Sequence, residues 1–150
     1  MIATEAWGDW IAADARLSAA IDSLRDAWIL SRKRVLVVDD DPDCATDMCQ
    51  ALRPIPTRRA GTADQAAEEL RRYVPHVLVT DLQFHNGEDG RDLARRAISM
   101  PSPPIVVLVS GIDRDLLDHL GRSLGAIAWF QKPFDPDRLR AAVERALLGR

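Results

Sequence analysis

The chain has 150 residues, of which 47% are hydrophobic and 29% are charged, a composition typical of one globular domain. Its net charge of −3 at pH 7 argues against a protein that binds nucleic acid through bulk positive charge. No apolar run approaches the ~20 residues that cross a bilayer, and residues 1–5 lack the basic start of a secretory signal. Cys44 and Cys49 are the only cysteines, so we expect no disulfide framework and a reducing, cytoplasmic location.

The first predicted element is a helix over residues 5–31, where no glycine or proline follows Gly8. Apolar residues recur there at helical spacing, namely Trp10, Leu17, Ile21, Leu24 and Trp28. Asp14 interrupts this stripe. The basic residues 32–34 close the segment, as suits the negative end of a helix dipole.

An isolated helix of this length is marginal in water unless its apolar face is buried. Three partners could bury this apolar face: a second copy of the chain in a homodimer, the rest of this chain, or another protein. The helix contains three of the four tryptophans, and tryptophan is enriched in interface hot spots, which favours an interface. Its acidic polar face argues against a membrane-surface helix.

From residue 34 onward, short apolar runs alternate with helical patterns. The runs predict buried strands at residues 34–39, 76–81 and 105–110, and a shorter strand at 126–130. Residues 53–60 are expected to form an edge strand or an irregular segment, because Pro54 and Pro56 each remove a hydrogen-bond donor. Helices are predicted at 42–52, 62–73, 90–99, 113–124 and 136–148.

Some details of these helices can also be predicted. Thr62 is a plausible N-cap, and Gly125 is placed to end the helix before it. In the helix at 113–124, the leucines expected to face inward are Leu116, Leu117, Leu120 and Leu124. Because parallel strands need crossover helices, the alternation predicts an α/β protein with a doubly wound, five-stranded parallel sheet and an extra N-terminal helix.

In such sheets, ligands bind outside the carboxyl ends of the strands. The residues with reactive or charged side chains at the predicted strand ends are Asp39, Asp40, Asp81, Ser110 and Lys132. Because the carboxyl ends of parallel strands meet at one edge, we expect several carboxylates, one hydroxyl and one ammonium in a single cleft.

Crowded carboxylates repel one another, and a hard divalent cation such as Mg²⁺ offsets that repulsion. We expect Asp40 and Asp81 to be direct metal ligands, with Asp39 acting partly through water. One carboxylate can then attack a phosphoryl group and form an aspartyl phosphate. Lys132 and Ser110 are placed to stabilise the oxygens of the transferring group.

Four segments, in order along the chain, resemble the receiver domain of two-component response regulators, the CheY-like family. They are VLVVDDDPD at 35–43 (first strand and acidic pair), LVTDL at 78–82 (phosphoacceptor strand), VLVSG at 107–111 (switch hydroxyl) and QKPF at 131–134 (Lys-Pro pair). Trp129 falls where the family carries a rotating aromatic residue. The resemblance covers roughly residues 33–148 and implies a flavodoxin-like receiver at 33–150 after a helical extension at 1–32.

The resemblance implies that Asp81 accepts a phosphoryl group from a histidine kinase or a histidine phosphotransfer protein, in a reaction that requires Mg²⁺. The implied metal ligands are Asp39, Asp40, Asp81 and the backbone carbonyl of Gln83. Ser110 and Trp129 would form the switch. The chain is then expected to be a single-domain response regulator that alters its binding to an effector protein, without direct DNA contact. It would not be a classical enzyme, because its only reactions are self-catalysed phosphotransfer and dephosphorylation.

The sequence departs from the family pattern in two places. The first is the loop after Asp81, where His85 replaces the usual proline after Phe84, and Gly90 comes one position late. The second is the proline-rich second strand. Three alternatives stay open: a phosphate sink or relay carrier, a phosphorylation-independent pseudo-receiver, and a phosphohydrolase. His85 is expected to be an ordinary exposed loop residue.

Three simpler interpretations also remain. Ser110 could simply cap the next helix, Trp129 could be part of the core, and Cys44 and Cys49 are expected to act as small hydrophobes.

Overall fold

A computed structural model describes residues 2–150, with side chains from residue 6 onward, so Met1 lies outside the described residues. The helices are α1 (Ile2–Ser31), α2 (Pro42–Ala51), α3 (Ala63–Arg72), α4 (Gly90–Ile98), α5 (Arg114–Ser123) and α6 (Pro136–Leu148). The strands are β1 (Val35–Val38), β2 (Thr57–Ala60), β3 (Val77–Thr80), β4 (Ile105–Ser110) and β5 (Ala128–Gln131). Over the described range, no helix combines the length and the apolar character needed to span a bilayer.

The five strands form one sheet in the order β2-β1-β3-β4-β5, and all pairs are parallel. The predicted fold class is therefore confirmed. In the register, Val38 of β1 lies beside Thr80 of β3. The residues that follow these two strands, Asp39 and Asp81, therefore leave the sheet side by side.

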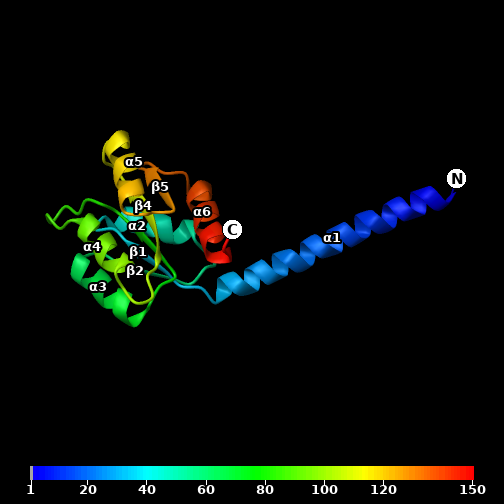
Figure 1. Cartoon of the computed structure of the whole chain (residues 1–150), viewed down its shortest axis with the longest axis horizontal. Helices are drawn as coiled ribbons and strands as arrows, with labels where there is room; N and C mark the ends of the chain where they lie inside the picture. The colour runs from blue at the N-terminus through cyan, green and yellow to red at the C-terminus, as the bar shows by residue number, and fades with distance from the viewer. Residues whose placement is uncertain (1) are drawn as a thin grey trace.

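Alternate residues of the central strands pack against different helices, as expected for strands buried on both faces. On one face, Val37 and Val79 pack with residues of α2 and α6. On the other face, Leu36 and Leu78 pack with residues of α3 and α4, while α5 covers the β4 end of the same face. Figure 1 shows this layering, with α3 and α4 on the side of the sheet opposite α6.

The predicted elements all form, with differences at their ends. The second strand is confined to β2, so both prolines of the segment predicted at 53–60 precede it, and α1 begins at Ile2 rather than at residue 5. The last strand begins at Ala128, two residues later than expected, because Ala126 still bonds back to the carbonyl of Gly121 in the turn after α5. The inward position predicted for Leu116 is wrong: its side chain is 45% exposed, and α5 packs through Leu117 and other residues. The predicted caps are confirmed, as is the edge position of β2.

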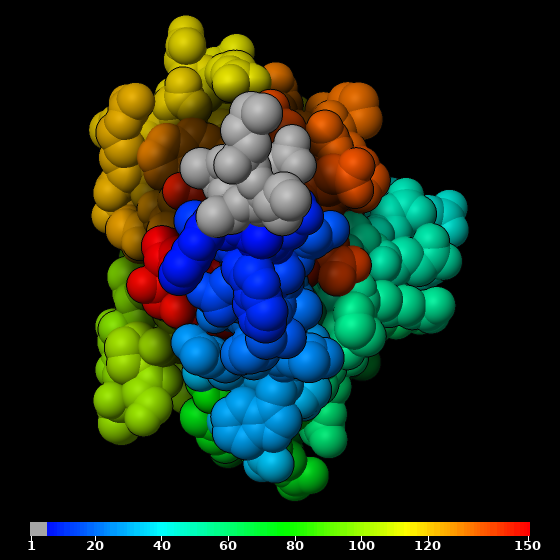
Figure 2. Space-filling view, turned by 90° about the vertical axis from the view of Figure 1, so that its right-hand side faces the viewer, coloured from blue at the N-terminus to red at the C-terminus, as the bar shows by residue number. Residues whose placement is uncertain are grey.

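Helix α1 extends away from the sheet and its covering helices (Figure 1). The C-terminal end of α1 contacts α6, and Leu30 of α1 packs against the core there. Both carboxylate oxygens of Asp26 accept hydrogen bonds from the guanidinium of Arg150, at 2.8 and 2.9 Å. These contacts fix the base of the helix, and the view along α1 in Figure 2 shows the rest of it projecting in front of the domain.

Leu78→Ala is expected to lower the free energy of unfolding by about 2–5 kcal/mol, because it opens a cavity in the middle of the sheet. Leu78 is fully buried. Urea or thermal denaturation of the full chain measures the change. Leu116→Ala removes the same atoms from an exposed position and should cost below about 1 kcal/mol. Equal losses in the two variants would contradict the placement of α5.

Candidate functional site

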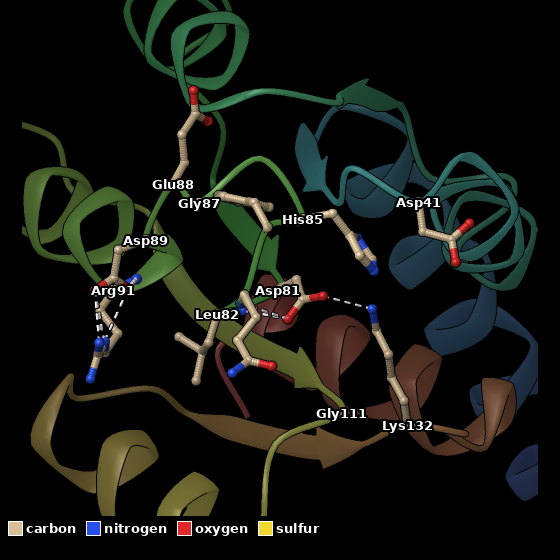
Figure 3. Close-up of a pocket in the computed structure, with 12 residues that line it drawn as sticks. Asp41, Asp81, Leu82, His85, Gly87, Glu88, Asp89, Arg91, Gly111 and Lys132 are labelled. Carbon is tan, nitrogen blue, oxygen red and sulfur yellow. Dashed lines mark hydrogen bonds and ion pairs between the residues drawn. The ribbon is translucent and has the colours of Figure 1, made fainter.

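Three charged side chains meet at the carboxyl edge of the sheet. The Nζ atom of Lys132, which follows β5, lies 2.7 Å from Asp39 Oδ2 and 2.7 Å from Asp81 Oδ2. Asp39 is 2% exposed and Asp81 5% exposed. Figure 3 shows Lys132 reaching across the mouth of the pocket toward Asp81. The structure thus brings together residues that lie 51 and 93 positions apart in the sequence.

The environment of Lys132 keeps it charged. Burial lowers the pKa of the ammonium, but the hydrogen bonds and negative charges of Asp39 and Asp81 outweigh this effect and raise the pKa above its ordinary value. A permanent positive charge therefore stands between two buried carboxylates. It offsets the mutual repulsion of their negative charges.

Asp40 completes a cluster of three acids. One carboxylate oxygen each from Asp39, Asp40 and Asp81 lie within 4.8 Å of one another. Asp40 Oδ1 is buried and has no hydrogen-bond partner among the described residues. The cluster offers oxygen atoms only, and it contains an unsatisfied buried carboxylate oxygen, so it fits a hard divalent cation such as Mg²⁺.

The other oxygen of Asp40 is held by the loop after β3. Asp40 Oδ2 accepts a hydrogen bond from the backbone N–H of His85 and lies 3.0 Å from the ring Nδ1 of the same residue. The ring is 86% exposed, as expected for a loop residue. The contact with Asp40 was not predicted, because nothing in the sequence pattern links positions 45 residues apart.

Backbone donors fix one side of the Asp81 carboxylate. Its Oδ1 accepts hydrogen bonds from the N–H groups of Leu82 at 2.6 Å and Gln83 at 3.0 Å. Its Oδ2 faces Lys132. The two oxygens of Asp81 therefore differ in their partners: Oδ1 accepts backbone hydrogen bonds, and Oδ2 contacts the ammonium of Lys132 in the pocket.

Ser110, the last residue of β4, is fully buried, and its hydroxyl has no hydrogen-bond partner among the described residues. The interpretation of Ser110 as a simple helix cap is wrong, because Asp113 caps α5 by accepting from the N–H groups of Asp115 and Leu116. An unpaired buried hydroxyl is costly, because it has lost its hydrogen bonds to water without replacing them.

Trp129 occupies a fitted place on α5. Its indole N–H donates to Asp118 Oδ1 at 2.7 Å, and its ring lies so close to Gly121 that an added Cβ would come within 2.3 Å of it. Next to it, the side chain of Gln131 donates to the carbonyl of Ile112 at 3.0 Å. This bond ties β5 to the loop that follows Ser110. Neither Asp118 nor Gly121 was predicted as part of the site, because their roles depend on how α5 packs on β5.

The lengthened loop after β3 is held at both ends. Glu88 accepts a hydrogen bond from the N–H of Ala63, at the start of α3, at 2.7 Å. Gly90 donates to the carbonyl of Leu82 and begins α4 directly against the backbone of Asp81. A Cβ on Gly90 would lie 2.1 Å from the Asp81 carbonyl oxygen. Glycine is therefore required where α4 approaches the strand end.

The thiol of Cys44, near Asp39, is not activated as a nucleophile. Burial, followed by the negative charge of Asp39, raises the pKa of Cys44 to about 11. Cys44 therefore stays protonated at neutral pH, as expected for a small hydrophobe rather than a nucleophile.

Comparison with known proteins places this chain in a family. Residues 35–144 match the family described as the response regulator receiver domain. The chain is 31% identical over 118 residues to the transcriptional regulatory protein PdtaR of Mycobacterium tuberculosis, which aligns 77% of this chain with 57% of that protein. It is 35% identical over 119 residues to the DNA-binding response regulator MtrA of Mycolicibacterium smegmatis, aligning 77% of this chain with 51% of that protein. The chain thus spans little more than half the length of these relatives.

A solved structure supports the same grouping. The signal receiver domain of a response regulator from Bermanella marisrubri superimposes with a TM-score of 0.68 at 28% identity. The superposition covers 76% of this chain and 97% of that chain.

Gly90→Ala is expected to lower the free energy of unfolding by about 1–3 kcal/mol, because the new methyl group overlaps the backbone of Asp81. The matched control is Gly61→Ala, where the nearest heavy atom to the added Cβ is 3.8 Å away. Thermal denaturation of both variants measures the difference. If Gly90→Ala is no less stable than Gly61→Ala, α4 does not press on Asp81 as described.

Proposed function

Since this chain belongs to the response regulator receiver domain family, we propose that Asp81 accepts a phosphoryl group from a partner histidine kinase or histidine phosphotransfer protein. The family is a signalling family, and its membership implies phosphorylation on an aspartate. The observation that carries the assignment to Asp81 is its place in the pocket. Asp39 and Asp81 both contact Lys132 at 2.7 Å, but of the three clustered acids Asp81 is the one that lines the described pocket together with Lys132.

Asp39, Asp40 and Asp81 would hold a Mg²⁺ ion, and the backbone carbonyl of Gln83, a residue of the same pocket, would add a further oxygen ligand. When bound, the ion neutralises charge that develops on the transferring phosphoryl group. The remaining chemistry belongs to side chains of this protein. The unpartnered Oδ1 of Asp40 supports this assignment, because a metal ion would satisfy it.

In the transfer step, Asp81 Oδ2 is the nucleophile, because Oδ1 is engaged by two backbone N–H groups. A new P–O bond forms to Oδ2 while the P–N bond of the donor phosphohistidine breaks. The imidazole of the partner leaves with the electron pair of that bond and takes up a proton. Lys132, already bonded to Oδ2, is in reach of a phosphoryl oxygen and stabilises the negative charge.

Phosphorylation would change the conformation of the protein through Ser110 and Trp129. The buried Ser110 hydroxyl, which has no partner here, would donate to a phosphoryl oxygen. The loop after Ser110 would follow, and the Gln131–Ile112 hydrogen bond couples this loop to β5. Trp129 would then repack from its place on Gly121, which shifts the population of conformations of the face formed by α5, β5 and α6. The output is a changed affinity for an effector protein.

In this proposal residues 33–150 are the receiver and residues 1–32 are a separate helical extension. Self-catalysed phosphotransfer and dephosphorylation are its only reactions. The two free cysteines suit a reducing, cytoplasmic compartment.

Incubation of the full chain with acetyl phosphate and Mg²⁺ should add one phosphoryl group, detected by intact mass. Asp81→Asn should add none, because it lacks the nucleophilic oxygen. Chelation of Mg²⁺ with EDTA should also prevent the gain.

The matched control is Asp135→Asn, which changes an acid that caps α6 by accepting from the N–H groups of Asp137 and Arg138, where asparagine caps equally well. This variant should be phosphorylated like the wild type. Phosphorylation of Asp81→Asn would contradict the proposal. Absence of phosphorylation and of Mg²⁺ binding in the wild type would instead favour a pseudo-receiver.

Ser110→Ala separates the role of Ser110 in the switch from a structural role. It removes a buried hydroxyl that has no partner, so the free energy of unfolding should stay within about 1 kcal/mol of the wild type or increase. The rate of phosphorylation by acetyl phosphate should fall, because a donor to the phosphoryl group is lost. A strongly destabilised Ser110→Ala protein would show that the hydroxyl already has a partner in the unphosphorylated state.

A further inference from the structure

Helix α1 carries an apolar face that no other described residue of this chain covers. Its exposed large apolar side chains are Trp7, Trp10, Ile11, Leu17, Ile21, Leu24 and Trp28. Trp10, for example, is 76% exposed. In the described part of the chain, α1 packs against α6 only near its base. An exposed apolar face along a 30-residue helix is the mark of a surface that binds a partner.

The spacing of this face is that of a coiled coil. In a heptad assignment, the a positions are Trp7, Asp14, Ile21 and Trp28, and the d positions are Trp10, Leu17 and Leu24. The flanking g positions are Ala6, Ala13, Ala20 and Ala27. An unbroken seven-residue repeat predicts a left-handed pair of helices, and alanine on the flank lets the two backbones approach closely.

We propose that α1 pairs with α1 of a second copy of this chain as an antiparallel coiled coil. The orientation follows from Asp14, the one charged residue of the seam. A parallel pair would place the two Asp14 carboxylates against each other, and the residues beside them would be alanines. Two like charges in a desolvated seam cost several kcal/mol, so the parallel pair is disfavoured.

An antiparallel pair resolves the charge in one register. When the helices cross near residue 19, Asp14 lies level with Leu24 of the partner subunit and beside Arg25 of the partner subunit. By the two-fold symmetry, Arg25 pairs with Asp14 of the partner subunit. Arg25 is available for this contact, because its one ion pair in the structure is an exposed one with Asp22 at 3.8 Å.

The same register pairs the large apolar side chains. Leu17 lies opposite Ile21 of the partner subunit, and Trp10 lies opposite Trp28 of the partner subunit. Shifting the crossing point by half a heptad places Asp14 opposite Leu17 of the partner subunit, and no basic residue stands beside it. The opposite shift places Asp14 opposite Ser31 of the partner subunit and beside Arg32 of the partner subunit, but it leaves Trp7 and Trp10 beyond the end of the partner helix. Charge and apolar pairing together therefore select the register that crosses near residue 19.

The size of the face fits a stable dimer. Each tryptophan offers on the order of 150 Å² or more of surface, and the seven exposed apolar side chains together offer on the order of 800 Å² per chain, which is the usual contribution of one partner. The Asp26–Arg150 ion pair and Leu30 hold the base of α1 on the domain. The two receiver domains would therefore lie at opposite ends of a paired stretch, residues 7–31 of each helix, about 37 Å long. This inference does not depend on phosphorylation.

Sedimentation equilibrium of the full, unphosphorylated chain should show a dimer at micromolar concentration. Ile21→Asp should weaken association by at least tenfold, because it places a carboxylate in the apolar seam. Ser23→Asp changes an outward-facing position of the same helix and is the matched control, expected to stay dimeric. A wild-type chain that is monomeric at all concentrations would overturn the proposal and leave the face to a different protein.

Charge reversal tests the orientation. Asp14→Arg and Arg25→Asp should each weaken the dimer by about tenfold, because each creates two like-charge pairs, and the double variant should restore association. The two residues are 11 positions apart in one helix, about 16 Å, so restoration requires contact between chains. If the double variant instead shows the sum of the two single losses of dimer affinity, the antiparallel register is contradicted. Phosphorylation of the same samples is measured separately, so failure of either proposal is distinguishable.

Discussion

The arrangement of this protein depends on one interaction, the contact of the Lys132 ammonium with the buried carboxylates of Asp39 and Asp81. Two ionised carboxylates this close would repel each other strongly in a low-dielectric environment. The lysine offsets that repulsion, and the geometry works because three parallel strands end at the same edge. The apolar strands β1 and β3 set the spacing, since their register leaves Asp39 and Asp81 side by side. The fold is thus the means by which distant charges are held together.

Two atoms of the site are left unsatisfied in this state, Asp40 Oδ1 and Ser110 Oγ. A buried polar atom without a partner costs roughly 1–3 kcal/mol. Their positions explain why the cost is tolerated: one lies in the acidic cluster and the other at the end of the neighbouring strand. A metal ion would satisfy the first and a phosphoryl oxygen the second. In the proposed function, binding of these two partners would remove that cost and so favour the phosphorylated state.

Much of this site could be predicted from the sequence, because each acid directly follows a buried apolar run and such runs identify strand ends. Asp39, Asp81 and Lys132 were found in this way. The contact of Trp129 with Asp118 and Gly121 could not be, because it depends on the side-by-side packing of α5 and β5. Helical periodicity predicted an inward position for Leu116, which is exposed. The periodicity gives the direction of the buried face of α5, but it does not give how wide that face is. The meeting of His85 with Asp40 depends on the path of a loop that has no periodic pattern.

We propose that Asp81, rather than another acid of the cluster, carries the phosphoryl group. Borohydride reduction of the phosphorylated chain converts an aspartyl phosphate to homoserine, and peptide mass spectrometry then locates it. If Asp81 is the acceptor, homoserine appears at position 81 alone, at a level that follows the degree of phosphorylation. Homoserine at position 39 or 40, or a phosphorylated chain without homoserine at 81, would contradict it.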